Sequence, residues 1–78
     1  MNNERVIYTV QEVAKLLHSS PNYIYELINK GLLRAIKLGS LKIRRDELER
    51  FLLENEGNDL SDLNNIKTLN GKEGVING

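Results

Sequence analysis

The stretch that decides the fold is residues 9–31, which read TVQEVAKLLHSSPNYIYELINKG. Its first element is marked by Thr9 and by Glu12 three residues later. This spacing is typical of a capping box, in which a hydroxyl and a carboxylate satisfy two free backbone donors at a helix start. We therefore expect a helix of about two turns that begins at Val10. Its apolar stripe consists of Val10, Val13, Ala14 and Leu17.

A second helix start follows a break at residues 18–19. Ser20 is a favoured capping residue, and Pro21 is pre-set for the first helical position, where its missing N–H costs nothing. The helix should run to about Lys30, with Gly31 just past its end as the residue that adopts positive φ. One side of this helix is apolar, with Ile24, Leu27 and Ile28. The other side is fully polar, with Asn22, Glu26, Asn29 and Lys30.

Further along the chain the apolar residues begin to alternate. Two alternating runs, residues 35–38 and 41–44, flank Gly39 and Ser40, which predicts a hairpin with a two-residue turn. The expected pairs are Leu38 with Leu41, Lys37 with Lys42, Ile36 with Ile43 and Ala35 with Arg44. On this register Ile36, Leu38, Leu41 and Ile43 face inward, whereas Lys37, Lys42 and Arg44 face outward. Directly opposed lysines repel each other, so this surface is expected to meet negative charge.

The hairpin is followed by a third helix and then by a change in composition. Asp46 and Glu47 suit the positive end of a helix whose apolar positions are Leu48, Phe51 and Leu52. We expect a flexible N-terminus over residues 1–7, a folded domain over residues 8–54, and an acidic, Gly- and Asn-rich mobile tail over residues 55–78. An alternative for the tail is a short helix on a partner, formed around Leu60, Leu63 and Ile66.

Length and composition exclude several classes of protein. A chain of 78 residues buries a thin core, which leaves little room for a large substrate cavity. Cysteine is absent and His18 is the single histidine, which excludes disulfides, thiolate zinc sites and thiol nucleophiles. Without a catalytic constellation we expect no enzyme, no metal site and no cofactor. No apolar run is long enough to cross a bilayer, and residues 1–9 lack a signal-peptide core, so a cytoplasmic location is expected.

The net charge of zero hides an uneven distribution along the chain. Residues 1–53 carry nine basic and six acidic side chains, whereas residues 54–78 carry two basic and five acidic ones. Residues 30–45 contain six basic residues and no acidic residue. This window is expected to face an anionic partner or solvent.

Several short segments occur in a fixed order across residues 8–53. They are Tyr8-Thr9-Val10-Gln11-Glu12-Val13-Ala14, Leu16-Leu17, Ile24-Tyr25-Glu26-Leu27-Ile28, Gly31, Leu38-Gly39, Ile43 and Asp46-Glu47-Leu48-Glu49-Arg50-Phe51-Leu52. Together they resemble the excisionase-like branch of the MerR-type winged helix-turn-helix superfamily. The resemblance implies an α+β, mainly α fold of three short helices, with a two-stranded antiparallel wing between the second and third helices.

Two positions depart from the family pattern. His18 and Ser19 stand where the family usually has glycine and a small apolar residue in the turn between the helices. Arg44 stands where Ser or Thr often caps the third helix, a loss of about 1 kcal/mol unless a phosphate or a neighbouring carboxylate compensates through the arginine.

The resemblance also implies how the chain meets DNA, with the second helix in the major groove and the wing on the adjacent backbone or minor groove. Residues expected to contact bases are Asn22, Tyr23, Glu26 and Asn29. Residues expected to contact the backbone are Ser20, Lys30, Arg34, Lys37, Ser40, Lys42, Arg44 and Arg45. For each set the alternative is a solvated surface without a ligand.

Three functions fit this reading. The first is an excisionase, or recombination directionality factor, that bends attachment-site DNA and assists a separate site-specific integrase. The second is a small phage- or plasmid-type transcriptional regulator, and the third is a protein-interaction module whose basic wing binds an acidic partner. The first implies double-stranded DNA as partner, cooperative self-association on repeated sites, no small-molecule effector, and a bacterial or phage-encoded, nucleoid-associated protein.

Overall fold

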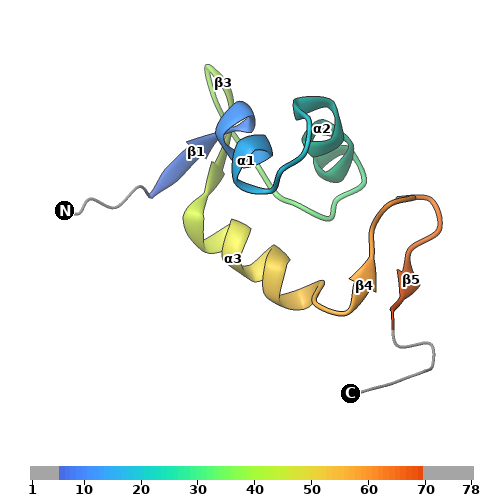
Figure 1. The fold of residues 1–78 in the computed structure, drawn as a ribbon. Coiled ribbons are helices and arrows are strands. Elements are labelled where there is room, and N and C mark those ends of the chain that lie inside the picture. Colours follow the sequence, from blue (N-terminus) through green and yellow to red (C-terminus); the bar gives the residue numbers. More distant parts are fainter. Residues whose placement is uncertain (1–5, 70–78) are drawn as a thin grey trace.

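The computed structural model describes residues 6–69, and Figure 1 shows how their helices and strands are arranged. The elements, in chain order, are β1 (Ile7–Thr9), α1 (Val10–Leu16), α2 (Pro21–Asn29), β2 (Ile36–Leu38), β3 (Ser40–Arg44), α3 (Arg45–Glu54), β4 (Asn58–Asp59) and β5 (Lys67–Thr68). The three predicted helices and the hairpin between α2 and α3 are therefore confirmed. The fold is a winged helix-turn-helix, with the β2–β3 hairpin as the wing.

The start of α1 is the capping box that the sequence predicts. The Glu12 backbone N–H donates to Thr9 Oγ1 at 3.1 Å, and the Thr9 N–H donates to Glu12 Oε1 at 2.9 Å. Ser20 caps α2 in a simpler way, with its Oγ accepting from the Tyr23 N–H at 3.2 Å. Both helix starts are thus set by local sequence.

The break between α1 and α2 is a left-handed turn at His18, whose φ is 55°. The Ser19 N–H donates to the Ala14 carbonyl at 2.7 Å and the His18 N–H to the Lys15 carbonyl at 3.1 Å. This pair of bonds is a Schellman motif, which usually places glycine at the left-handed position. The turn therefore forms without the family's glycine, with His18 in a conformation that its Cβ disfavours.

The sheet differs from the sequence prediction in strand number and in register. Three strands pair antiparallel in the order β1-β3-β2. β2 and β3 pair Ile36 with Lys42, Lys37 with Leu41 and Leu38 with Ser40, one residue out of the predicted register. The predicted pairs, including the opposed lysines, are wrong. Leu41 and Ile43 still face inward, whereas Ile36 and Leu38 are 40% and 55% exposed.

β1 adds a strand that the sequence analysis did not predict, since it assigned Ile7 to a flexible N-terminus and Tyr8 and Thr9 to the start of the folded domain. β1 pairs Tyr8 with Ile43, which places both side chains on the face that packs against the helices. Because side chains alternate along a strand, a slip of one residue moves every side chain of β2 to the opposite face. Leu33, fully buried just before the wing, contributes to the core in place of the β2 residues.

The core of the described residues joins all three helices to β3. Its buried members are Val10, Val13, Ala14, Ile24, Leu27, Leu33, Ile43, Leu48 and Phe51. The apolar positions predicted for α1 and α2 lie in or against this core. In α3, Leu48 and Phe51 are buried as expected, but Leu52 is 44% exposed.

The start of α3 depends on the backbone instead of on a capping side chain. Arg44 occupies the cap position and makes no side-chain cap hydrogen bond. The Arg45 N–H instead donates to the Val6 carbonyl at 3.0 Å, and Arg44 Nη2 lies 3.1 Å from Asp46 Oδ2. Residues 6–7 therefore belong to the folded unit, and residues 1–5 lie outside the described residues.

Residues 55–69 fold back onto the domain, in contrast to the expected mobile tail. β4 and β5 pair antiparallel, and Leu69 N–H donates to the Gly57 carbonyl at 2.7 Å. Leu60 and Leu63 pack against the core, but this segment contains no helix. We call residues 55–69 the C-terminal segment; the rest of the predicted tail, residues 70–78, lies outside the described residues.

Candidate nucleic-acid interface

The exposed side of α2 carries three of the four residues predicted to contact bases. Asn22, Glu26 and Asn29 are exposed, while Ile24 and Leu27 on the opposite side are completely buried. Burial of one side fixes the rotation of the helix, so the polar side chains point away from the core. Amides and carboxylates on an exposed helix are the groups that pair with base edges in the major groove.

The wing presents exposed basic groups beside a tight tip. Lys37 is exposed, and Lys42 Nζ donates to the Leu38 carbonyl at 3.1 Å and to Ser40 Oγ at 3.0 Å. Gly39 forms the tip with a φ of 78°. Since Ser40 Oγ accepts from Lys42, its own hydrogen remains available to an anion.

The arginines at the base of the wing all lie near carboxylates of α3. Arg34 Nε is 3.7 Å from Glu47 Oε1, and Arg45 Nε is 3.9 Å from Glu49 Oε2. Arg44 is similarly close to Asp46. The acid-free window of residues 30–45 is therefore partly neutralised in space by the helix that follows it. Of these pairs, Arg44–Asp46 is exposed on both sides and contributes little to stability, so a phosphate can replace the Asp46 carboxylate at small cost.

Comparison with known proteins identifies the family. Residues 7–56 match the family described as "Helix-turn-helix domain". The chain belongs to this DNA-binding helix-turn-helix family. The match begins at β1 and ends just past α3, so it covers the helices, the turn and the wing described above.

A stretch of 50 residues of this chain also resembles a curated protein. The chain is 38% identical over these residues to an uncharacterised protein, YvgK, of Bacillus subtilis. The match covers 63% of this chain but 16% of that protein. No solved structure gives a significant match.

The C-terminal segment engages two of the predicted contact residues of this helix-turn-helix. Tyr23 Oη donates to the Leu60 carbonyl at 2.5 Å, and Lys30 Nζ donates to Asn64 Oδ1. Burial, followed by the charges of Glu26 and Asp59, raises the pKa of Tyr23. The phenol is thus a protonated donor to protein backbone, and the free polar surface of α2 is centred on Asn22, Glu26 and Asn29.

The same segment forms a polar groove beside α2. Its lining residues are Glu26, Asn29, Lys30, Ser61, Asp62, Leu63 and Asn64. The acidic side chains here oppose a phosphate, so the groove marks one edge of the candidate DNA surface. The sequence analysis missed this edge because it treated the segment as mobile.

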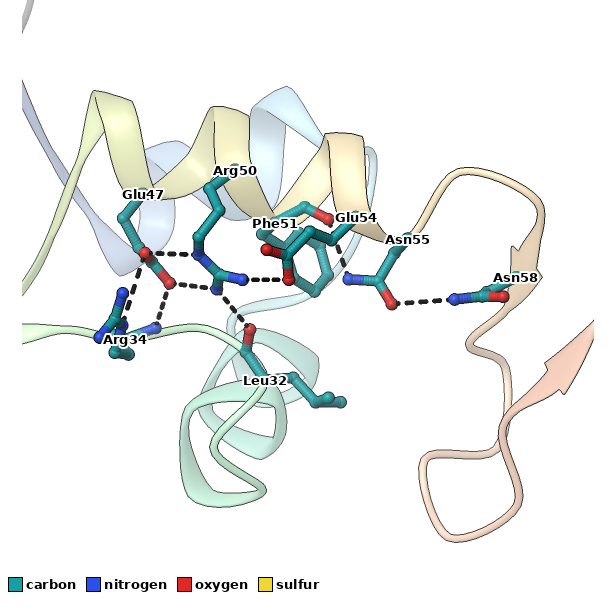
Figure 2. Close-up of polar contacts among 8 residues, drawn as sticks. All are labelled: Leu32, Arg34, Glu47, Arg50, Phe51, Glu54, Asn55 and Asn58. Carbon is teal, nitrogen blue, oxygen red and sulfur yellow. Dashed lines mark hydrogen bonds and ion pairs between the residues drawn. The ribbon is translucent and has the colours of Figure 1, made fainter.

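A salt-bridge network holds the entrance of the wing against α3 (Figure 2). Arg50 donates to both carboxylate oxygens of Glu47, at 2.8 and 2.5 Å, and to the Leu32 carbonyl at 3.1 Å. Glu47 also accepts the Arg34 backbone N–H at 2.9 Å. The hydrogen bonds from Arg50, together with the backbone N–H of Arg34, lower the pKa of Glu47 to about 2. This network positions Arg34, and only its helical spacing, Glu47 to Arg50 to Glu54, is visible in the sequence.

The described residues offer neither a cluster of metal ligands nor a membrane-spanning helix. Within residues 6–69 no group of three or more His, Asp or Glu side chains is placed to hold a metal ion. None of the helices in that range has the length and apolar character needed to span a membrane.

Proposed function

We propose that this chain is a sequence-specific binder of double-stranded DNA, with α2 in the major groove and the wing against the neighbouring backbone. The observation that carries the proposal is the exposed amide and carboxylate surface of α2 next to an exposed basic hairpin. This pairing supplies base readout from one element and phosphate attraction from the other.

Base readout is assigned to the exposed side of α2. Asn22 and Asn29 offer the amide that pairs with adenine N6 and N7, and Glu26 accepts from a cytosine amino group. Tyr23 reaches a base or a phosphate only if its hydrogen bond to Leu60 breaks. Ser20 stays a cap, at a helix start where a phosphate also binds readily.

The phosphate contacts are assigned to the basic residues in and around the wing. They are Lys30, Arg34, Lys37, Lys42, Arg44 and Arg45, with Ser40 as a hydroxyl donor. Their contribution sets affinity and weakens with salt, but it carries little sequence information. Selectivity then depends on α2 and on several copies bound to repeated sites.

The biological role that we propose is that of an excisionase. The order of segments that resembles the excisionase-like branch of the MerR-type superfamily supports it, as does membership of a DNA-binding helix-turn-helix family. The protein would bend attachment-site DNA and assist a separate integrase, which cuts and rejoins the strands, in a bacterial or phage-infected cytoplasm. A small transcriptional regulator is the second candidate, because it uses the same surface.

To test this, the purified chain is mixed with fragments of the source genome and competitor DNA at about 150 mM salt, and the bound fragments are recovered and sequenced. Repeats beside an integrase attachment site support the excisionase, and repeats over a promoter support the regulator. Failure to enrich any fragment at any salt concentration overturns DNA binding and leaves the protein-partner alternative. Asn22→Ala combined with Glu26→Ala should abolish the enrichment, whereas Gln11→Ala, an exposed change on α1, should not.

The excisionase role needs its own assay. Excision by the cognate integrase should rise when this chain is added and should stay at the basal level with the Asn22→Ala, Glu26→Ala variant. Unchanged excision together with altered promoter activity would assign the chain to transcription instead.

A further inference from the structure

The tip of the wing carries an apolar side chain that the fold leaves uncovered. Leu38 is 55% exposed, and Ile36, two residues earlier on the same side of β2, is 40% exposed. The observed register places them opposite Ser40 and Lys42 instead of opposite core residues. A Cβ built on Gly39 would meet nothing within 4 Å, so the tip stands in open space. Figure 1 shows the wing extending away from the helices.

The hydrogen bonds of Lys42 brace this tip. Its ammonium group joins the Leu38 carbonyl and the Ser40 hydroxyl, the two residues that flank Gly39. These bonds fix the backbone of the tip, from which the exposed Leu38 side chain projects. A tip whose backbone is braced before binding loses less conformational entropy when it enters a partner.

The charge around Leu38 distinguishes it from Leu53, the exposed leucine near the end of α3. A single exposed leucine needs no explanation in itself. Leu53, at 70% exposure, lies next to Glu54 and one helical turn from Glu49, so its surroundings are acidic. The Lys42 ammonium group lies at the Leu38 carbonyl, and Lys37 is exposed on the opposite face of the same strand, so both faces of the wing tip carry positive charge that attracts an anionic partner.

We infer that Leu38 is an apolar wedge that enters the minor groove of double-stranded DNA and opens a base step there. This inference rests on the proposed function and adds a residue that sets the bend. The minor groove, about 6 Å wide, admits a hairpin tip and lies between two rows of phosphates that Lys37 and Lys42 can neutralise. Apolar side chains inserted between base steps unstack them and kink the duplex.

The wedge predicts where on the DNA the wing binds. Pyrimidine–purine steps such as TA and CA unstack most easily, so the bound sites should carry such a step where the wing lies. This preference depends on how easily the DNA deforms, and it is separate from the base contacts that α2 makes.

The test compares Leu38→Ser with Lys37→Ala and with Leu53→Ser as a matched exposed control, all in the full chain. Affinity for a site selected by the wild-type chain is measured between 50 and 200 mM salt, and the bend by circular permutation of the site. Leu38→Ser should lower affinity about tenfold at every salt concentration, with an unchanged salt slope and a smaller bend. Lys37→Ala should reduce the salt slope by about one, and Leu53→Ser should change neither quantity.

Leu38→Met is the rescue variant, because it keeps an apolar side chain of similar volume. It should bind and bend like the wild type. All four variants change exposed positions, and circular dichroism with thermal unfolding checks that each one is folded.

Two results overturn the inference and are distinguishable. A wild-type chain that binds no DNA overturns the proposed function together with the wedge. A Leu38→Ser variant that binds and bends like the wild type, while Lys37→Ala still weakens binding, overturns the wedge alone and leaves a wing that contacts only phosphates.

Discussion

At the scale of single residues, Glu47 is the carboxylate that joins the entrance of the wing to α3. It accepts hydrogen bonds from Arg50 and from the Arg34 backbone, and its side chain is 10% exposed (Figure 2). Glu47→Gln removes the charge and should lower the free energy of unfolding by about 2 kcal/mol. Urea denaturation measures this loss.

Glu49→Gln is the matched control for Glu47→Gln. The Glu49 side chain is 69% exposed and its oxygen lies 3.9 Å from Arg45 Nε. An exposed pair of this kind contributes about 0.5 kcal/mol or less. Equal losses for the two variants would contradict the structural role assigned to Glu47.

The pKa of Glu47 also predicts how stability depends on pH. This pKa lies at about 2 in the folded chain, below its ordinary value of 4.5. Between these values the unfolded chain binds more protons, so stability is fully present above about pH 5 and falls as the pH drops toward 2. Glu47→Gln should flatten this fall when urea midpoints are compared at pH 3 and pH 6. A variant with the same pH dependence as the wild type would assign the acid sensitivity to other carboxylates.

At the scale of elements, the turn between α1 and α2 is strained at His18, and a substitution can relieve this strain. His18 adopts a φ of 55°, which a Cβ disfavours and glycine does not. His18→Gly should raise the free energy of unfolding by about 0.5–1 kcal/mol and the Tm by a few °C. Ser19→Gly, which follows the left-handed position, should lower the Tm. A His18→Gly variant less stable than the wild type would show that the imidazole has a contact of its own.

At the scale of the whole molecule, the C-terminal segment joins the domain through Tyr23, Leu60 and Leu63. Deleting residues 57–78 exposes the core beneath these leucines and should lower the Tm. On the proposed function the truncated chain still binds DNA at temperatures where it stays folded. Loss of the main activity in a folded truncated chain would favour the protein-partner alternative.

Tyr23→Phe isolates the hydrogen bond of this junction without removing the segment. It should lower the free energy of unfolding by about 1 kcal/mol, measured by urea denaturation. Tyr25→Phe, at a position 39% exposed on α2, is the control and should change stability much less. A Tyr23→Phe variant as stable as the wild type would remove the Leu60 contact from the description of the fold.

Local signals in the sequence determined most of the helix-turn-helix. The caps at Thr9 and Ser20, the positive φ of Gly31 and the apolar spacing of the helices act within a few residues of one another. Signals of this kind can be read without reference to the rest of the chain. The charge pattern likewise indicated an anionic partner, although it did not show the carboxylates of α3 that lie beside the arginines.

Only the tertiary structure decided the register of the wing and the docking of the C-terminal segment. Alternation along β2 and β3 favours the register that puts all four apolar side chains on one face, but the structure pairs Ile36 with Lys42 and buries Leu33 in the core instead. Leu60 lies 37 positions from Tyr23 along the chain, so no local pattern reveals their contact. These choices depend on which apolar surfaces are buried together, a non-local property that the chain acquires only when its core closes.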